Sequence, residues 1–317
     1  MVRPKLDPKT GDTWSAQPVQ RLFLGVDGGG TKCRMRLADE NLQTLGEAMS
    51  EKPSNLQVRD GDAAYEAVRE LIGEVYAQAG LDVAQANNTS ACFGMAGGRL
   101  PAARDAFTAR DYPFANLQVY DDIDIARAGA HEGEDGAVLI VGTGSAGLGL
   151  IDGKRHQIGG WGFHVGDTMS GAILGRELLR KSLLAHEGLV PGSPLTKAVM
   201  QRFDNEPNKL MTWSFNNPDI KRPARPADYG EFVPVFFEHF EKGDAVAQEL
   251  MHFEMAAIDQ YVHWFMGHGA KAIAVVGGFG RRLYPLLKER YGELIVEPKS
   301  EPLHGALILA RQLYGAA

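Results

Sequence analysis

The sequence predicts an α/β protein built from two related lobes, each centred on a mixed β-sheet. The main observation is a repeated pattern, in which an apolar strand, a glycine-rich turn, a second strand and a polar turn follow one another. The pattern occurs at 22–41 and again at 137–154. Strands and helices alternate through the rest of the chain, and the initial hairpin of each lobe makes its sheet mixed rather than purely parallel.

The first half of the chain opens with strands at 22–26 and 33–38, on either side of the first glycine turn. A loop at 52–55 precedes an amphipathic helix at 62–79, where apolar residues recur at helical spacing, and Gly80 stops that helix. The elements that follow are a buried strand at 89–96, a helix at 101–109, a strand at 117–120, and a helix to about Gly133 that joins the lobes.

The second half repeats this plan with an insertion. After the hairpin at 137–151, five apolar residues at helical spacing predict a helix at 170–186. The proline-containing stretch 191–228 predicts a partly irregular insert. The remaining expected elements are helices at 229–241 and 244–267 with Asp244 as N-cap, a strand at 271–276, a third glycine turn at 277–280, a helix at 281–291, a strand at 293–297 and a closing helix at 302–314.

Composition excludes several classes of function. The chain has 317 residues, a formal charge of -7 and a pI near 5.7, which argues against nucleic acid or an anionic membrane as the main partner. No apolar run approaches the ~20 residues of a spanning helix. The polar segment 1–20 has no apolar signal region and predicts a flexible lead, and two isolated cysteines give no disulfide framework. We therefore expect a cytoplasmic protein.

Domain boundaries follow from the repeat. We expect an N-terminal lobe at 21–126 completed by 302–317. The C-terminal lobe is expected at 127–301, with a helical insert at about 187–243.

The glycine turns favour phosphate binding, because glycine lets backbone N–H groups approach the oxygens of a polyphosphate. Gly142–Gly147 fits the G-x-G-x-x-G spacing of dinucleotide-binding proteins, but a strand rather than a helix follows it. A Walker A sequence is absent. Ordinary hairpin turns are the remaining alternative, and three such turns, each closing an apolar strand, favour phosphate binding over it.

An ordered series of motifs identifies a family resemblance. The series consists of Asp27-Gly-Gly-Gly-Thr31, Asp122, Gly142-Thr-Gly-Ser145, Gly159-Gly-Trp-Gly162, Gly166-Asp167 and Gly277-Gly278. It resembles the sugar kinase/actin/heat-shock ATPase superfamily from about Leu22 to Leu313, and within it the BadF/BadG-type ATPase branch that contains the glucosamine and N-acetylglucosamine kinases. The resemblance implies a two-lobed actin-like (ribonuclease H-like) fold with a nucleotide cleft between the lobes. It also implies ATP-dependent phosphorylation of the 6-hydroxyl of glucosamine or N-acetylglucosamine.

The resemblance assigns the nucleotide site to the glycine turns. The phosphate-binding residues it implies are Asp27, Gly28, Gly29, Gly30, Thr31, Lys32, Gly142, Thr143, Gly144, Ser145, Gly277 and Gly278. Asp27 would hold Mg²⁺ with the nucleotide, often through water, which suits a hard cation; its alternative role is to cap the turn. Lys32 is either a phosphate contact or a solvated hairpin residue, and Phe279 is a candidate neighbour of the base.

Asp122 is the expected catalytic base. A carboxylate at the end of a strand can accept the proton of the attacking hydroxyl during phosphoryl transfer. The family pattern of Asp followed four residues later by Ala fits Asp122 and Ala126. Asp121 and Asp124 flank it, so Asp121 remains an alternative base, and at least one of the three acids is expected to cap the following helix.

The implied sugar site combines residues from both halves, namely Asn55, Asp122, Thr143, Gly160, Trp161 and Asp167. Trp161 would provide an apolar wall, and its alternative is packing in the core. A free amine on the sugar would call for a carboxylate, whereas an acetamide would call for an apolar wall, and both substrates stay open.

Three other functions are alternatives to a kinase. Reductase-activating ATPases of the same branch hold an iron–sulfur cluster through cysteines, which the positions of Cys33 and Cys92 disfavour. A sugar-sensing regulator would add a DNA-binding module that segment 1–20 is too short to supply. An ATPase with another substrate is the third alternative. Dimers are common among the kinases that the chain resembles, and the sequence leaves monomer and homodimer open.

Overall fold

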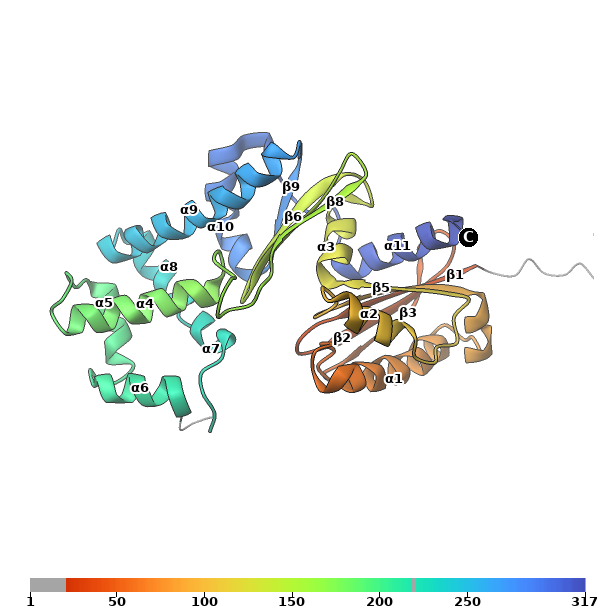
Figure 1. The fold of residues 1–317 in the computed structure, drawn as a ribbon, viewed down its shortest axis with the longest axis horizontal. Helices are drawn as coiled ribbons and strands as arrows, with labels where there is room; N and C mark the ends of the chain where they lie inside the picture. The colour runs from red at the N-terminus through yellow and green to blue at the C-terminus, as the bar shows by residue number, and fades with distance from the viewer. Residues whose placement is uncertain (1–20, 218–220, 317) are drawn as a thin grey trace, which may run out of the picture. The chain divides into compact units, whose positions relative to one another are not determined.

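The computed structural model describes residues 21–217 and 221–316, so the flexible lead predicted at 1–20 lies outside the described residues. The chain divides into two compact units. Unit 1 ends at Gly129 and resumes at Glu301, and unit 2 comprises Ala130–Ser300. Each unit contains one five-stranded mixed sheet with helices against it (Figure 1). The predicted α/β class with duplicated mixed sheets is confirmed.

The sheet of unit 1 has the order β3-β2-β1-β4-β5. The hairpin strands β1, β2 and β3 run antiparallel, while β1, β4 and β5 run parallel to one another. The strands are β1 (Leu22–Gly28), β2 (Cys33–Ala38), β3 (Thr44–Ser50), β4 (Thr89–Met95) and β5 (Asn116–Asp121).

Helices cover both faces of this sheet. The helices are α1 (Asp62–Gln78), α2 (Pro101–Thr108), α3 (Asp122–His131), which runs on into unit 2, and α11 (Pro302–Ala316). Alternate residues of β1 serve the two faces, since Leu24 packs in the cluster that includes α1 whereas Phe23 packs with α11 residues. Helix α11 comes close to β1 at Gly25, where a Cβ would lie 3.0 Å from the Cβ of Ala306. The C-terminal helix thus completes unit 1 beside its first strand (Figure 1).

Unit 2 repeats the same arrangement. Its sheet has the order β10-β9-β6-β7-β8, with an antiparallel β6-β7-β8 meander and parallel neighbours β9 and β10. Its strands are β6 (Gly136–Val141), β7 (Ser145–Ile151), β8 (Lys154–Gly159), β9 (Ile273–Val276) and β10 (Ile295–Val296). The β7–β8 turn has Asp152 and Gly153 at φ 49° and 69°, the left-handed pair that a tight hairpin requires.

The helices of unit 2 include the predicted insert. They are α4 (Gly171–His186), α5 (Pro194–Gln201), α6 (Pro207–Asn216), α7 (Pro226–Gly230), α8 (Val233–Glu241), α9 (Ala245–Gly267) and α10 (Gly278–Tyr291). Asp244 caps α9 as predicted, since its carboxylate accepts the N–H groups of Val246 and Ala247. No helix in the described part of the chain is long and apolar enough to cross a membrane.

The structure corrects several element boundaries. Strands β3 and β8 were not predicted, because edge strands with polar residues lack a continuous apolar pattern. The insert is more helical than expected, and α7 and α8 replace a single helix at 229–241. Helix α10 begins at Gly278, so the third glycine turn is the N-terminus of that helix, and β7 begins at Ser145.

Candidate active site

Three parallel strands of unit 1 end at the same edge of its sheet. Gly28 at the end of β1 lies opposite Met95 of β4, and Met95 lies opposite Asp121 of β5. Because neighbouring strands lie about 4.8 Å apart, the ends of β1 and β5 are about 10 Å apart. Helix α3 then begins directly at Asp122. The structure therefore brings Asp27, the first glycine loop and the acidic pair, Asp121 and Asp122, together at one edge.

The first glycine loop, residues 29–32, joins β1 to β2. Gly30, Thr31 and Lys32 are exposed, and a Cβ at Gly30 would have no heavy atom within 4 Å. Gly28 differs from its neighbours, because it is buried and a Cβ there would lie 2.6 Å from a methionine sulfur of β4. The exposed turn is thus suited to receive an anion on its backbone, whereas Gly28 allows the strand ends to pack.

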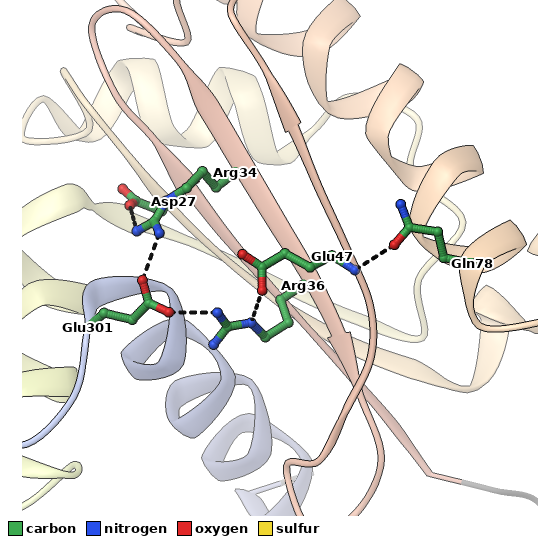
Figure 2. Close-up of polar contacts among 6 residues, drawn as sticks. All are labelled: Asp27, Arg34, Arg36, Glu47, Gln78 and Glu301. Atoms are coloured by element: carbon green, nitrogen blue, oxygen red, sulfur yellow. Dashed lines mark hydrogen bonds and ion pairs between the residues drawn. The ribbon is translucent and has the colours of Figure 1, made fainter.

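Asp27 forms an ion pair that the sequence analysis did not identify. Its Oδ2 accepts a hydrogen bond from Nη2 of Arg34 at 2.8 Å, and Arg34 stands directly opposite Asp27 in the β1–β2 ladder. Figure 2 shows that the Arg34 guanidinium also reaches Glu301. The alternation of CRMRLA was the available signal, because it places Arg34 and Arg36 on one face of β2.

The Asp122 carboxyl has a strongly raised pKa. Burial, the charge of Asp121 and the charge of Asp27, in that order, raise the pKa of Asp122 to about 7. The backbone N–H of Ile123 opposes this rise, because it stabilises the ionised form. A carboxyl group with a pKa near neutrality can exist as either acid or base at the pH of the cell, which is what general acid–base chemistry requires.

Asn55 lies beside the first glycine loop. The backbone N–H of Ser54 donates to the carbonyl of Gly29 at 2.8 Å, so the 52–55 loop is tied to the turn. The side-chain Oδ1 of Asn55 accepts the N–H of Gln57 at 2.8 Å. This bond fixes the amide, and the NH₂ group of Asn55 is left as its donor.

The second glycine loop, Gly142-Thr143-Gly144, lies in unit 2. It is braced by Asp167, because a Cβ at Gly144 would lie 2.9 Å from the Asp167 Oδ2. Burial raises the pKa of Asp167, while backbone N–H groups of Ser145 and Gly162 hydrogen-bond its carboxylate and lower it, leaving a net rise. Asp167 therefore connects the second glycine loop to the glycine stretch at 159–162.

Trp161 is exposed rather than packed in the core. The residue is 63% exposed, which contradicts the alternative that Trp161 packs in the core. The neighbouring N–H of Gly160 donates to the carbonyl of Ser145 at 3.0 Å. The backbone next to Trp161 is thus tied to the end of the second glycine loop, and the exposed indole ring presents apolar surface to a ligand.

A cavity of about 470 Å³ opens beside the second and third glycine motifs, entirely within unit 2. Its lining residues are Gly142, Thr143, Gly171, Ala227, Gly230, Glu231, Val233, Pro234, Phe237, Gly278, Phe279 and Arg282. Phe279, the candidate neighbour of the base, lines this cavity. Helices α7 and α8 were not expected there, since nothing in their sequence indicates which cavity they approach. A mainly apolar wall with a few polar groups is typical of a nucleoside site.

Helix N-termini border this cavity. Gly277 has φ 100°, and a Cβ there would lie 2.5 Å from the carbonyl oxygen of Val141, so glycine is required for α10 to start beside β6. In the described part of the chain, the N-cap residue Gly277 makes no side-chain cap hydrogen bond at the start of α10. The N–H of Gly171 in α4 donates to the carbonyl of Gly142 at 2.8 Å. Backbone N–H groups at a helix start favour phosphate oxygens.

The residues present fit Mg²⁺. Within the described residues, Oδ1 of Asp27 has no hydrogen-bond partner, so one carboxylate oxygen is available to a cation or its water. Mg²⁺ is usually bound by one or two carboxylates together with substrate phosphates. In the described ranges no group of three or more potential metal-ligating side chains occurs, and both cysteines are buried inside strands.

Comparisons with known proteins identify a family for this chain. A sequence profile of the BadF/BadG/BcrA/BcrD ATPase family matches residues 24–310. The glucosamine kinase of Vibrio cholerae is 34% identical over 289 residues, covering 91% of this chain and 95% of that protein. The N-acetyl-D-glucosamine kinase of Dictyostelium discoideum is 26% identical over 246 residues, covering 73% and 75%.

A solved structure supports the same relationship. A protein of Chromobacterium violaceum, assigned as an N-acetylglucosamine kinase, superposes with a TM-score of 0.79 at 29% identity, covering 92% of this chain and 100% of that chain. A glucokinase of Streptomyces griseus from the ROK family, solved with glucose and AMPPNP, reaches 0.54 at 18% identity, with 92% and 99% covered. The second likeness shows the fold alone.

Proposed function

Because the chain belongs to the BadF/BadG/BcrA/BcrD ATPase family, we propose that it is an amino-sugar kinase, which transfers the γ-phosphate of ATP to the 6-hydroxyl of glucosamine or N-acetylglucosamine. The observation that carries the proposal is Asp122, a carboxyl group with a pKa of about 7 at the strand edge that holds the first glycine loop. The relatives named as amino-sugar kinases supply the substrate class.

Asp122 acts as the base in this proposal. Phosphoryl transfer requires positioning, charge neutralisation and an acceptor for the hydroxyl proton, and its transition state is stabilised mainly by electrostatics. The ionised Asp122 orients the sugar hydroxyl and receives its proton as the oxygen–phosphorus bond forms. We prefer Asp122 to Asp121, because Asp122 is the first residue of α3, directly after the strand end.

The adenosine is assigned to unit 2, and each unit contributes a glycine loop suited to phosphate. The apolar cavity beside Phe237 and Phe279 receives the adenosine, and the N–H groups of the glycine motifs receive the phosphate oxygens. Asp27 would hold Mg²⁺, directly or through water, and the cation would offset the charge of the phosphates. A cytoplasmic location is the matching proposal, because the reaction consumes ATP.

For the sugar, unit 1 offers Asn55, and unit 2 offers Trp161 and Asp167. The exposed Trp161 ring can cover an apolar face of the sugar, and the amide NH₂ of Asn55 can donate to a hydroxyl. Asp167 already accepts two backbone N–H groups, so it can accept a sugar hydroxyl only with its remaining lone pairs.

The test is ADP release with Mg²⁺ and ATP in the presence of glucosamine, N-acetylglucosamine, glucose or no sugar. We expect strong stimulation by an amino sugar, and a loss of at least about 100-fold in the Asp122→Asn variant, because a missing base costs on the order of 10²–10⁴-fold. Turnover that does not depend on sugar would contradict the kinase proposal and leave an ATPase with another substrate. An equally active Asp122→Asn variant would contradict the base assignment.

A further inference from the structure

Five charged side chains of unit 1 form a continuous chain of alternating sign, from Asp27 through Arg34, Glu301 and Arg36 to Glu47 (Figure 2). Nη1 of Arg34 donates to Oε2 of Glu301 at 2.7 Å, and Nη2 of Arg36 donates to Oε1 of the same residue at 2.6 Å. The Nε of Arg36 donates to Oε2 of Glu47 at 2.8 Å. Each arginine therefore joins two carboxylates.

Arg34 is more constrained than a surface arginine. Its side chain is 23% exposed, and its Nε is buried with no hydrogen-bond partner among the residues that the structure describes. Burying a donor without a partner costs free energy of desolvation. The hydrogen bonds made by the two terminal nitrogens of the guanidinium must offset this cost, and they hold the group in place. Through these two bonds, Arg34 links Asp27 to Glu301.

Glu301 gives this network a second anchor. It is the first residue of unit 1 after the chain returns from unit 2, and it immediately precedes α11. Burial raises the pKa of Glu301, but hydrogen bonds from Arg34 and Arg36 outweigh burial and leave the pKa below its ordinary value. Glu301 therefore stays ionised and binds Nη1 of Arg34, while Asp27 binds Nη2.

We propose that Arg34 is a positioning residue for the Mg²⁺–nucleotide site, and that it acts by holding the Asp27 carboxylate through one oxygen. With Oδ2 bound to Arg34, the carboxylate has a fixed orientation, and Oδ1 is the remaining acceptor for the cation or its water. Outer partners that orient a metal-binding carboxylate typically contribute 10–100-fold to metal affinity. This inference rests on the proposed function, because it needs Asp27 to serve the Mg²⁺–nucleotide.

Arg36 provides a matched control. It lies two residues further along β2 on the same face and contacts the same Glu301, but no contact joins it to Asp27 in the described residues. Arg36→Gln and Arg34→Gln therefore remove the same charge from the same strand. Only Arg34→Gln releases the carboxylate of Asp27.

The test is calorimetric binding of AMPPNP at a series of Mg²⁺ concentrations, with no sugar present and no turnover. We expect Arg34→Gln to raise the Mg²⁺ concentration needed for half-maximal binding by about 10-fold or more. Arg36→Gln should stay within about 2-fold of wild type. Arg34→Lys should recover only part of the loss, because a single ammonium does not replace the planar fork between two carboxylates.

A double-mutant cycle separates positioning from general stability. In an Asp27→Asn background, Arg34→Gln should cause no further change in Mg²⁺-dependent binding, because the partner through which it acts is gone. Equal shifts in Arg34→Gln and Arg36→Gln, or an unchanged Mg²⁺ requirement in Arg34→Gln, would overturn the inference. If the proposed function itself were wrong, the result would differ from both of these outcomes, since the wild-type protein would then show no sugar-stimulated ADP release.

Discussion

The acidic pair at the junction of β5 and α3, Asp121 and Asp122, predicts a specific pH dependence of kcat/KM. If Asp122 is the base, kcat/KM must fall when its carboxyl group becomes protonated in the free enzyme. Burial, the charge of Asp121 and the charge of Asp27 raise the pKa of Asp122 to about 7. The Asp121→Asn variant removes the neighbouring charge and leaves burial in place.

The size of the effect follows from this pKa. At pH 7 about half of the molecules have Asp122 ionised, and at pH 5 about one in a hundred, so kcat/KM should fall about 50-fold between these values. In Asp121→Asn the pKa of Asp122 is lower, because one of its causes is absent. The acid limb of the profile should therefore shift to lower pH, and the variant should lose less activity at pH 5.

The assay is kcat/KM for the amino sugar between pH 5 and 9 at saturating Mg²⁺ and ATP. Asp105→Asn is the control, because it removes an exposed carboxylate from α2 of the same unit. The control should reproduce the wild-type profile. An acid limb that stays in place in Asp121→Asn would refute the electrostatic reasoning, and a flat wild-type profile would refute the role of Asp122.

Three further substitutions test the packing. Gly230→Leu should raise KM for ATP by about 10-fold with an unchanged melting temperature, because Gly230 lines the cavity and a Cβ there meets nothing within 4 Å; an unchanged KM would exclude the cavity as the nucleoside site. Gly175→Ala should lower the urea unfolding free energy by about 1–3 kcal/mol, because its Cβ would lie 1.9 Å from the Tyr229 carbonyl oxygen, whereas Gly73→Ala in α1 should not destabilise. Glu254→Leu should raise the free energy of unfolding by about 1–3 kcal/mol at neutral pH, since both carboxylate oxygens are buried and have no hydrogen-bond partner within the described residues. Burial raises the pKa of Glu254, so the native state binds this proton before the unfolded state does, and the gain measured by urea unfolding should shrink as the pH falls toward the ordinary glutamate pKa.

Local patterns predicted most of the fold. The apolar strands before each glycine turn, the helix at α1 with Gly80 at its end and the Asp244 cap all depend on residues close in sequence, and each is found. Strands β3 and β8 escaped prediction, because their stability comes from pairing with a neighbouring strand and not from their own apolar content.

Long-range contacts account for what the sequence could not reveal about the site. The position of Asp122 at a strand end was predictable, but its raised pKa depends on burial and on Asp27 from another strand. Glu301 lies 267 residues from Arg34, so no spacing in the sequence indicates their contact. The sequence likewise does not indicate that α7 and α8 line the cavity, because their segment predicts only an insert.

The central claim is that the phosphoryl group of ATP is transferred to a sugar and not to water. The most direct measurement is ³¹P and ¹³C NMR of the products after incubation with Mg²⁺, ATP and either glucosamine or N-acetylglucosamine. The account predicts one new phosphate ester, coupled to carbon 6 of the sugar, in amounts equal to the ADP formed. Inorganic phosphate in place of the ester would contradict it.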